Sequence, residues 1–173
     1  MKNKYLLIIF GIFFLFCFTV FFKSLKNSNA YKPEIINGKI LSPFVAIDFY
    51  SNKKILSEDI FNDRDFYLIN IWASWCMPCR AEHNYLIELK KQNSLKLVGI
   101  NYKDQIENAK RFLNEFENPY SKILKDKNGT LSIKLGAYGV PETFIINKKK
   151  KIIKKIIGPI NEKTYNEILK IIK

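Results

Sequence analysis

The chain has 173 residues, of which 47% are hydrophobic and 26% are charged, which is ordinary for a globular protein. These values exclude wholesale disorder, a collagen-like chain and a multi-span membrane protein, and three cysteines are too few to staple a disulfide-dense miniprotein. The net charge is +13, but only Arg64, Arg80 and Arg111 are arginines, so no cluster offers bidentate contacts to phosphate. We therefore expect no binding of nucleic acid.

The first predicted element is an apolar segment. Tyr5 to Phe22 contains no charge and is bracketed by lysines, and as a helix it would span about 27 Å, close to the thickness of a bilayer core. A cleaved signal peptide has a shorter apolar region, although Ser28 to Ala30 would suit a cleavage site. We favour an uncleaved membrane anchor, with residues 1–30 as anchor or signal segment and 31–43 as a linker.

The rest of the chain, residues 44–173, reads as one folded domain of alternating strands and helices. Apolar runs of strand length such as DFYLINIWA predict central strands that are buried on both faces. Asp104 and Glu107 form a variant of the capping box before a helix, and 126–129 reads as a turn. We expect strands over 44–49, 53–56, 65–73, 95–101, 143–147 and 151–157, and helices over 79–91, from 106 to 116 and from 162 onward. This order predicts an α/β fold, a mixed sheet with helices on both faces.

Two cysteines lie where the strand over 65–73 passes into a helix, in the sequence WCMPC. A C-x-x-C motif at this place reads as a redox dithiol. The unpaired N–H groups of the helix N-terminus favour a thiolate at Cys76, which makes Cys76 the nucleophile and Cys79 the resolving thiol. Zinc would need more ligands than these cysteines and His83 provide, and haem attachment needs a histidine where Arg80 stands. We expect no metal and no cofactor, and a structural or surface role for His83.

Glu82 is the next candidate. Cys79, Glu82 and Leu86 share one face of the predicted helix, which should be turned toward the sheet. A carboxylate there would be partly desolvated and would hold a proton more readily, so it could accept the proton of Cys79. The alternative is an exposed acid that pairs with Lys90 or Arg80.

Gly139, Val140 and Pro141 precede the strand over 143–147. A proline that enters a strand after glycine is a candidate for a cis peptide bond, but cis bonds make up only about 5–6% of X–Pro bonds in folded proteins. The sequence by itself therefore leaves this bond open.

Four stretches together resemble the thioredoxin superfamily, and more narrowly the membrane-anchored thiol–disulfide oxidoreductases of cytochrome c maturation (the CcmG/DsbE type). They are NIWASWCMPCRAEH (70–83), VGINYKD (98–104), NPY (118–120) and LGAYGVPETFII (135–146). The resemblance implies a thioredoxin-like fold in which Val140–Pro141 is the cis-proline element that pairs with a bound peptide. It also implies that Trp75 and Glu142 belong to the peptide-binding side of the site.

The same resemblance implies an activity: reduction of disulfides in exported apocytochrome c, or in a thiol carrier that serves it, before haem attachment. It implies a single-pass protein of the inner (cytoplasmic) membrane with its domain on the periplasmic side, supplied with electrons by a transmembrane thiol donor. Thioredoxins carry a buried aspartate where this chain has Asn70, which leaves Glu82 as the better proton acceptor. The alternatives are a general exported disulfide reductase, a thiol peroxidase and a non-catalytic thioredoxin-like binding module.

Overall fold

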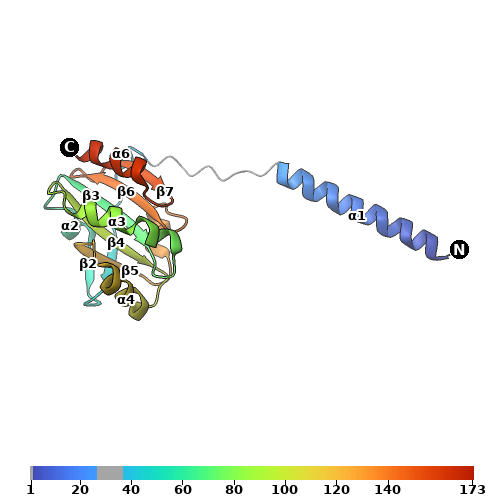
Figure 1. The fold of residues 1–173 in the computed structure, drawn as a ribbon, viewed down its shortest axis with the longest axis horizontal. Coiled ribbons are helices and arrows are strands. Elements are labelled where there is room, and N and C mark those ends of the chain that lie inside the picture. Colours follow the sequence, from blue (N-terminus) through green and yellow to red (C-terminus); the bar gives the residue numbers. More distant parts are fainter. Residues whose placement is uncertain (1, 27–36) are drawn as a thin grey trace. The chain divides into compact units, whose positions relative to one another are not determined.

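A computed structural model describes residues 2–26 and 37–173 of the chain (Figure 1). It divides into two compact units, Met1–Glu34 and Ile35–Lys173. The predicted cleavage site at 28–30 and the first part of the predicted linker, 31–36, lie outside the described residues.

The first unit contains helix α1 (Lys2–Lys26). Its segment Lys4–Lys23 has a mean hydropathy of 2.7, and its 20 residues match the thickness of a bilayer core at 1.5 Å per residue. Among the described residues it is the one helix long and apolar enough to cross a membrane. A signal sequence has the same properties, so α1 is consistent with either an anchor or a signal segment.

The second unit is built on a mixed seven-stranded sheet in the order β2-β1-β5-β4-β3-β6-β7. The central strands β3, β4 and β5 are parallel, whereas β6 and β7 continue the sheet in antiparallel fashion. The strands are β1 (Val45–Asp48), β2 (Lys54–Leu56), β3 (Phe66–Trp72), β4 (Leu95–Tyr102), β5 (Lys122–Asp126), β6 (Glu142–Asn147) and β7 (Ile152–Ile157). The helices are α2 (Ser57–Ile60), α3 (Met77–Lys90), α4 (Ile106–Phe116), α5 (Thr130–Lys134) and α6 (Glu162–Ile172).

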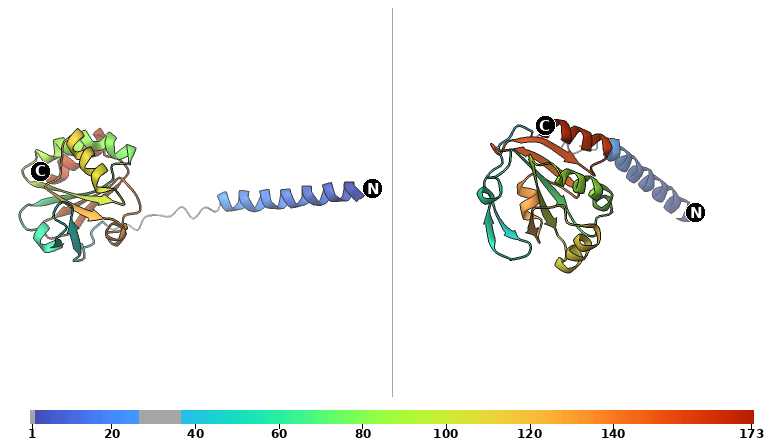
Figure 2. Two further views of the ribbon diagram at one scale, coloured as in Figure 1. Left: turned by 90° about the horizontal axis from the view of Figure 1, so that it is seen from below. Right: turned by 60° about the vertical axis from the view of Figure 1, so that its left-hand side comes forward.

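Strand β3 shows how the sheet divides the interior, because its side chains alternate between two hydrophobic cores. Leu68 and Trp72 pack in a core with α3, α4 and α6, which we call the α3 core. Tyr67, Ile69 and Ile71 pack in a second core with α2 and α5, which we call the α5 core. Helices therefore cover both faces of the sheet, as predicted (Figure 2).

The main difference from the prediction is strand β5, which the sequence analysis missed along with the short helices α2 and α5. Strand β5 (KILKD) mixes lysines with apolar residues, and only its end was predicted, as part of a turn. It lies between β4 and β1, and Ile123 and Leu124 are buried on opposite faces of the sheet. Its place in the sheet comes from neighbours far away in sequence, which local patterning does not reveal.

Residues 37–41, in the segment predicted as a linker, bond to β7 and to the turn before it. The N–H of Gly38 donates to the carbonyl of Ile152, and Ile40 forms an antiparallel bridge with Lys151. This contact lies at the β6–β7 turn. The chain therefore enters the domain beside the turn that follows β6. The start of β6, next to Pro141, lies at the other end of the sheet.

Candidate active site

The two cysteines lie at the start of α3, directly after the short loop that follows β3. Cys76 is the N-cap residue of α3, and its Sγ accepts a hydrogen bond from the N–H of Cys79 at 3.1 Å. Pro78 lies in the first turn, where backbone N–H groups have no partner within the helix, so its missing N–H costs no helical hydrogen bond. Cys76 and Cys79 are joined by a disulfide, and each residue is only 3% exposed. The predicted dithiol is thus brought together at a helix N-terminus.

The loop before the disulfide is held by Asp104, which follows β4. One carboxylate oxygen of Asp104 accepts from the N–H of Ser74 at 2.6 Å and the other from the Ser74 hydroxyl at 2.8 Å. Asn101 and the N–H of Gln105 donate to the same carboxylate. The predicted capping role of Asp104 is therefore wrong. The N-cap residue of α4 is Gln105, without a side-chain capping bond, because the Asp104 carboxylate is committed to a loop 30 residues earlier.

Trp75 and Met77 flank the buried disulfide and are exposed, by 58% and 74% respectively. The indole N–H of Trp75 donates to the carbonyl of Lys103 at 3.1 Å, which fixes the ring against the loop after β4. Tyr138, near the start of β6, is a third exposed aromatic or apolar side chain, at 54%. Trp75 and Met77 thus present exposed apolar surface directly beside Cys76 in the sequence.

Glu82 lies fully buried on α3, one turn beyond Cys79, on the face that packs against the sheet. Its Oε1 accepts from the Asn70 amide at 2.9 Å, and its Oε2 accepts from the N–H of Ile160 at 2.8 Å. Burial raises the pKa of Glu82 from 4.5 to about 7, although both hydrogen bonds act in the opposite direction. The alternative of an exposed acid paired with Lys90 or Arg80 is excluded.

The Val140–Pro141 peptide bond is cis, as the resemblance to the thioredoxin superfamily implied. Strand β6 starts directly after it and is antiparallel to β3, with Glu142 opposite Ile71. This register brings Val140 and Pro141 to the end of β3 from which the chain continues to Cys76. Val140 also packs against the α3 core, which contains both cysteines.

Glu142 is buried, with 3% exposure, and its carboxylate faces the loop that precedes it. Its Oε1 accepts from the N–H groups of Tyr138 and Gly139 at 2.7 and 2.9 Å. Its Oε2 forms an ion pair with Nζ of Lys155 at 2.7 Å, and that ammonium also donates to the carbonyl of Gly136. Lys155 and Glu142 together hold the loop that carries the cis bond.

Two hollows on the surface can be compared with the predicted site. One hollow, of about 730 Å³, lies between β1, β5 and α5 and includes none of the residues predicted for the site. The hollow beside Trp75 and Ser74 has only about 200 Å³ and also includes Arg80 and Phe112. Within the described part of the chain, no cluster of three or more His, Cys, Asp or Glu residues is placed to hold a metal ion.

Comparison with known proteins identifies the family. A family model described as Redoxin matches residues 44–170. The thiol:disulfide interchange protein DsbE of Vibrio cholerae is 40% identical over 172 residues, which cover 96% of this chain and 92% of the relative. DsbE of Escherichia coli strain K12 is 33% identical over 174 residues, covering 98% and 94%.

The chain belongs to the DsbE family of thiol:disulfide interchange proteins. This confirms the family suggested by the four sequence stretches, and it makes the chain a thiol:disulfide oxidoreductase with Cys76 and Cys79 as its C-x-x-C motif.

Solved structures confirm the thioredoxin-like fold of this DsbE family member. The thioredoxin domain of a thiol-disulfide oxidoreductase from Bacteroides vulgatus matches with a TM-score of 0.65 and 20% identity, over 79% of this chain and 98% of that one. A DsbF homologue from Corynebacterium diphtheriae matches with a TM-score of 0.67 and 22% identity, over 84% and 95%.

Several polar residues of this DsbE family site were not predicted as partners of Glu82. Asn70 donates to Glu82 and also to Thr143 Oγ1 at 3.0 Å, and it accepts from the hydroxyl of Tyr120 at 2.6 Å. The sequence did indicate that Asn70 has hydrogen-bond partners, because it interrupts an apolar run that is expected to be buried, and buried polar side chains are hydrogen-bonded. Tyr120 and Thr143 carry no such sign, because they meet Asn70 only through the folded sheet.

His83 is buried, and it has a structural role. Its Nε2 donates to the carbonyl of Glu117 at 2.8 Å, and its ring packs edge-on against Phe112 and Phe116. It therefore links α3 to the segment that follows α4.

Proposed function

We propose that this DsbE family member is a membrane-anchored reductase on the periplasmic side of the inner membrane, which reduces disulfides of apocytochrome c or of its thiol carrier. One juxtaposition supports this most: a dithiol at a helix N-terminus beside a cis-proline loop and above a buried glutamate. The membership of the family supports the same assignment.

In the reduced enzyme, Cys76 is the nucleophile. The N–H groups of the first turn of α3 and the helix dipole stabilise negative charge on its sulfur. The Cys76 thiolate attacks one sulfur of a substrate disulfide, the substrate S–S bond breaks, and one substrate thiolate leaves. Cys76 is then joined to the substrate through a mixed disulfide.

Cys79 resolves that intermediate with the help of Glu82. The Cys79 thiol gives its proton to the Glu82 carboxylate, and its sulfur attacks Cys76 to form the Cys76–Cys79 disulfide. The second substrate thiolate leaves and takes up a proton, so two electrons pass from the enzyme to the substrate. A pKa of about 7 suits Glu82 to accept and return a proton near neutral pH.

The substrate is a polypeptide segment. The exposed side chains of Trp75 and Met77, on either side of Cys76 in the sequence, and of Tyr138, in the loop before the cis bond, provide apolar contacts. Among the described residues, none bonds to the backbone N–H of Val140, so this edge can pair with an extended chain. We assign Glu142 to support of this loop through Lys155.

Helix α1 tethers the domain to the membrane, which confines it to the same surface as its membrane-bound partners and raises their effective concentration. An oxidising compartment keeps a dithiol as its disulfide unless electrons are delivered. A transmembrane thiol donor therefore restores the reduced state.

A competition assay tests the assignment. The reduced full-length chain in detergent is offered an oxidised C-x-x-C-H peptide, a disulfide-bonded maturation carrier and oxidised insulin, and the rate of thiol release is measured for each. Faster reduction of the haem-site peptide or the carrier supports the proposal. Equal or faster reduction of insulin favours a general disulfide reductase, consumption of hydroperoxide favours a peroxidase, and binding without thiol release favours a non-catalytic module.

A further inference from the structure

A chain of buried polar side chains connects Tyr120 to Glu82. The Tyr120 hydroxyl donates to Oδ1 of Asn70 at 2.6 Å, and Nδ2 of Asn70 donates to Glu82 Oε1 and to Thr143 Oγ1. The other oxygen of Glu82 accepts from the N–H of Ile160. Within the described part of the chain, the hydrogen bonds from Asn70 and Ile160 to the Glu82 carboxylate are both donated to it, which suits the ionised form.

The amide of Asn70 has two possible orientations, and Tyr120 distinguishes between them. Burial raises the pKa of Tyr120 well above its ordinary value, so the phenol keeps its hydrogen and donates it to Oδ1. With Oδ1 taken, Nδ2 points to Glu82. In the reversed orientation Oδ1 would face Glu82, which would then have to carry a proton to bond with it.

The reversed arrangement leaves the Tyr120 hydrogen without an acceptor, because Nδ2 of Asn70 would now donate to the phenol oxygen. An unpaired buried donor costs a measurable amount of free energy. The hydroxyl of Tyr120 therefore opposes the arrangement in which Glu82 is protonated.

We propose that Tyr120 is a positioning residue: by fixing the orientation of the Asn70 amide, its hydroxyl holds Glu82 as an ionised proton acceptor. This inference rests on the proposed role of Glu82 in resolution by Cys79. Tyr120 belongs neither to the C-x-x-C motif nor to the cis-proline loop. In this proposal it nevertheless controls how tightly the Glu82 carboxylate binds a proton.

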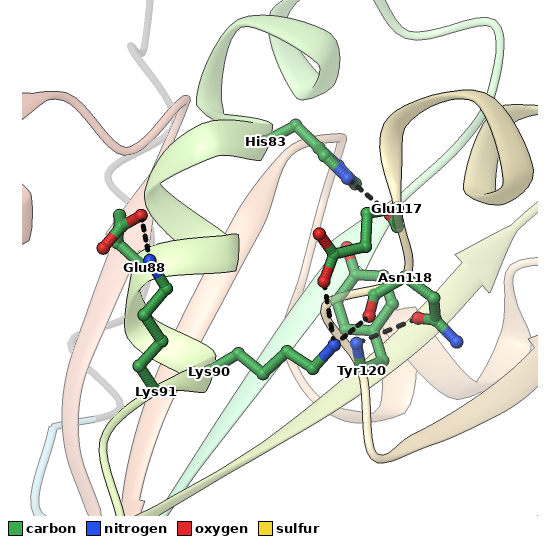
Figure 3. Close-up of polar contacts among 7 residues, drawn as sticks. All are labelled: His83, Glu88, Lys90, Lys91, Glu117, Asn118 and Tyr120. Atoms are coloured by element: carbon green, nitrogen blue, oxygen red, sulfur yellow. Dashed lines mark hydrogen bonds and ion pairs between the residues drawn. The ribbon is translucent and has the colours of Figure 1, made fainter.

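The position of Tyr120 is fixed by ties between its segment and α3, the helix that carries Glu82 (Figure 3). His83 donates to the carbonyl of Glu117, and Nζ of Lys90 donates to the carbonyl of Asn118. The side chain of Asn118 accepts from the N–H of Tyr120 at 2.9 Å. The segment that carries Tyr120 is therefore held to α3 by the side chains of His83 and Lys90, the latter also reaching the Glu117 carboxylate.

The Tyr120 ring is also held from the side of the sheet. It stacks on Trp72, with 5.6 Å between ring centroids and 19° between the planes. A Cβ atom at Gly99 would lie 2.9 Å from the Tyr120 ring and 2.8 Å from the Trp72 indole nitrogen. The glycine at this place on β4 is what allows both rings to lie against the strand.

Few other groups influence the titration of Glu82. Cys79 lies one turn away on its own helix, Asn70 faces it from β3 and the N–H of Ile160 faces it from the segment before α6. Burial raises the pKa of Tyr120, and the negative charge of Glu82 adds to this effect. Within the described residues, no lysine or arginine forms an ion pair with Glu82.

The test is a titration of Glu82 without substrate. The protonated carboxyl band of the oxidised full-length chain in detergent is followed by infrared spectroscopy against pH, and Glu82→Gln assigns the band. In Tyr120→Phe the midpoint should rise by about one pKa unit, because the reversed amide no longer leaves a phenol hydrogen unpaired. Tyr67→Phe is the control, since it removes another buried hydroxyl from the opposite face of the sheet.

A second variant keeps the hydroxyl and reverses the expected sign. Site-specific 3-fluorotyrosine at position 120 is a more acidic phenol and a stronger donor, so the midpoint of Glu82 should fall. An unchanged midpoint in folded Tyr120→Phe, or shifts of the same sign in both variants, would overturn the proposal. Because no turnover is measured, these results are independent of whether Glu82 acts in resolution, which the kinetics of Glu82→Gln decide.

Discussion

The two cores on either side of the sheet differ in what they bury. The α5 core is lined mainly by apolar side chains, and the hydroxyl of Tyr67 is satisfied by the N–H groups of Asp63 and Arg64. A buried carboxylate on this face, that of Glu142 opposite Ile71, is paired with Lys155. On the face toward α3, the sheet also buries Asn70, and Glu82 meets it from the helix. The face toward α3 therefore places a titratable carboxyl close to the dithiol, whereas the opposite face buries the carboxylate of Glu142 as an ion pair with Lys155.

The largest contrast should come from substitutions of the two cysteines in the α3 core and of Ile69 in the α5 core. Cys76→Ser should abolish disulfide reduction, and Cys79→Ser should accumulate mixed disulfides through Cys76, because the resolving thiol is gone. Ile69→Ala should lower the free energy of unfolding by about 2–5 kcal/mol through loss of buried surface. Thiol release per folded molecule and urea unfolding measure the two effects.

The outcome that contradicts this contrast is a loss of activity per folded molecule in Ile69→Ala, which would tie the α5 core to the chemistry. Limited alkylation of the reduced protein near neutral pH should modify Cys76 first. Preferential modification of Cys79 would reverse the roles of the two cysteines.

A smaller effect is expected from the charge of Glu82. Its pKa is raised from 4.5 to about 7 by burial, so the folded protein binds this proton more tightly than the unfolded chain does. Ionising Glu82 thus opposes folding, and about 3 kcal/mol of stability present below about pH 4.5 is lost as the pH rises through about 7. Glu82→Gln should lack this loss, and it should also slow attack by Cys79.

Urea unfolding of the oxidised protein across this pH range measures the stability effect. Glu115→Gln, at an exposed position on α4, is the matched control and should follow the unsubstituted chain. A stability difference between Glu82→Gln and the unsubstituted chain that does not change with pH would show that Glu82 does not titrate in this window.

The smallest effect concerns the loop between β3 and α3. Asp104→Ala leaves the buried N–H and hydroxyl of Ser74 without their acceptor, at about 1–3 kcal/mol, and should slow the reaction of Cys76 with a disulfide. Glu107→Ala, which removes the other acid of the predicted capping box, should cost less than about 0.5 kcal/mol. Equal losses in the two variants would restore the capping interpretation.

The sequence was most informative where chemistry and local structure coincide. The spacing of residues along one helix predicts both the dithiol at the start of α3 and the burial of Glu82. The apolar runs of β3 and β4 predict buried strands. These features depend on neighbours within a few turns or a single strand.

What the sequence did not reveal depends on contacts between distant segments. Asp104 has the pattern of a capping residue, but its carboxylate binds a loop 30 residues earlier. Tyr120 reaches Asn70 across 50 residues, and Thr143 reaches it across 73. Strand β5 is defined by β4 and β1 on either side of it. Local propensity carries no information about such partners.

The placement of the two tryptophans gives the protein an optical readout of its own redox state. The chain has two tryptophans: Trp75 directly precedes Cys76, and Trp72 packs in the core that contains both cysteines. A disulfide accepts electrons from a nearby excited indole and so quenches its emission. The fluorescence should therefore brighten on reduction and dim on oxidation, which makes each turnover visible without an added dye.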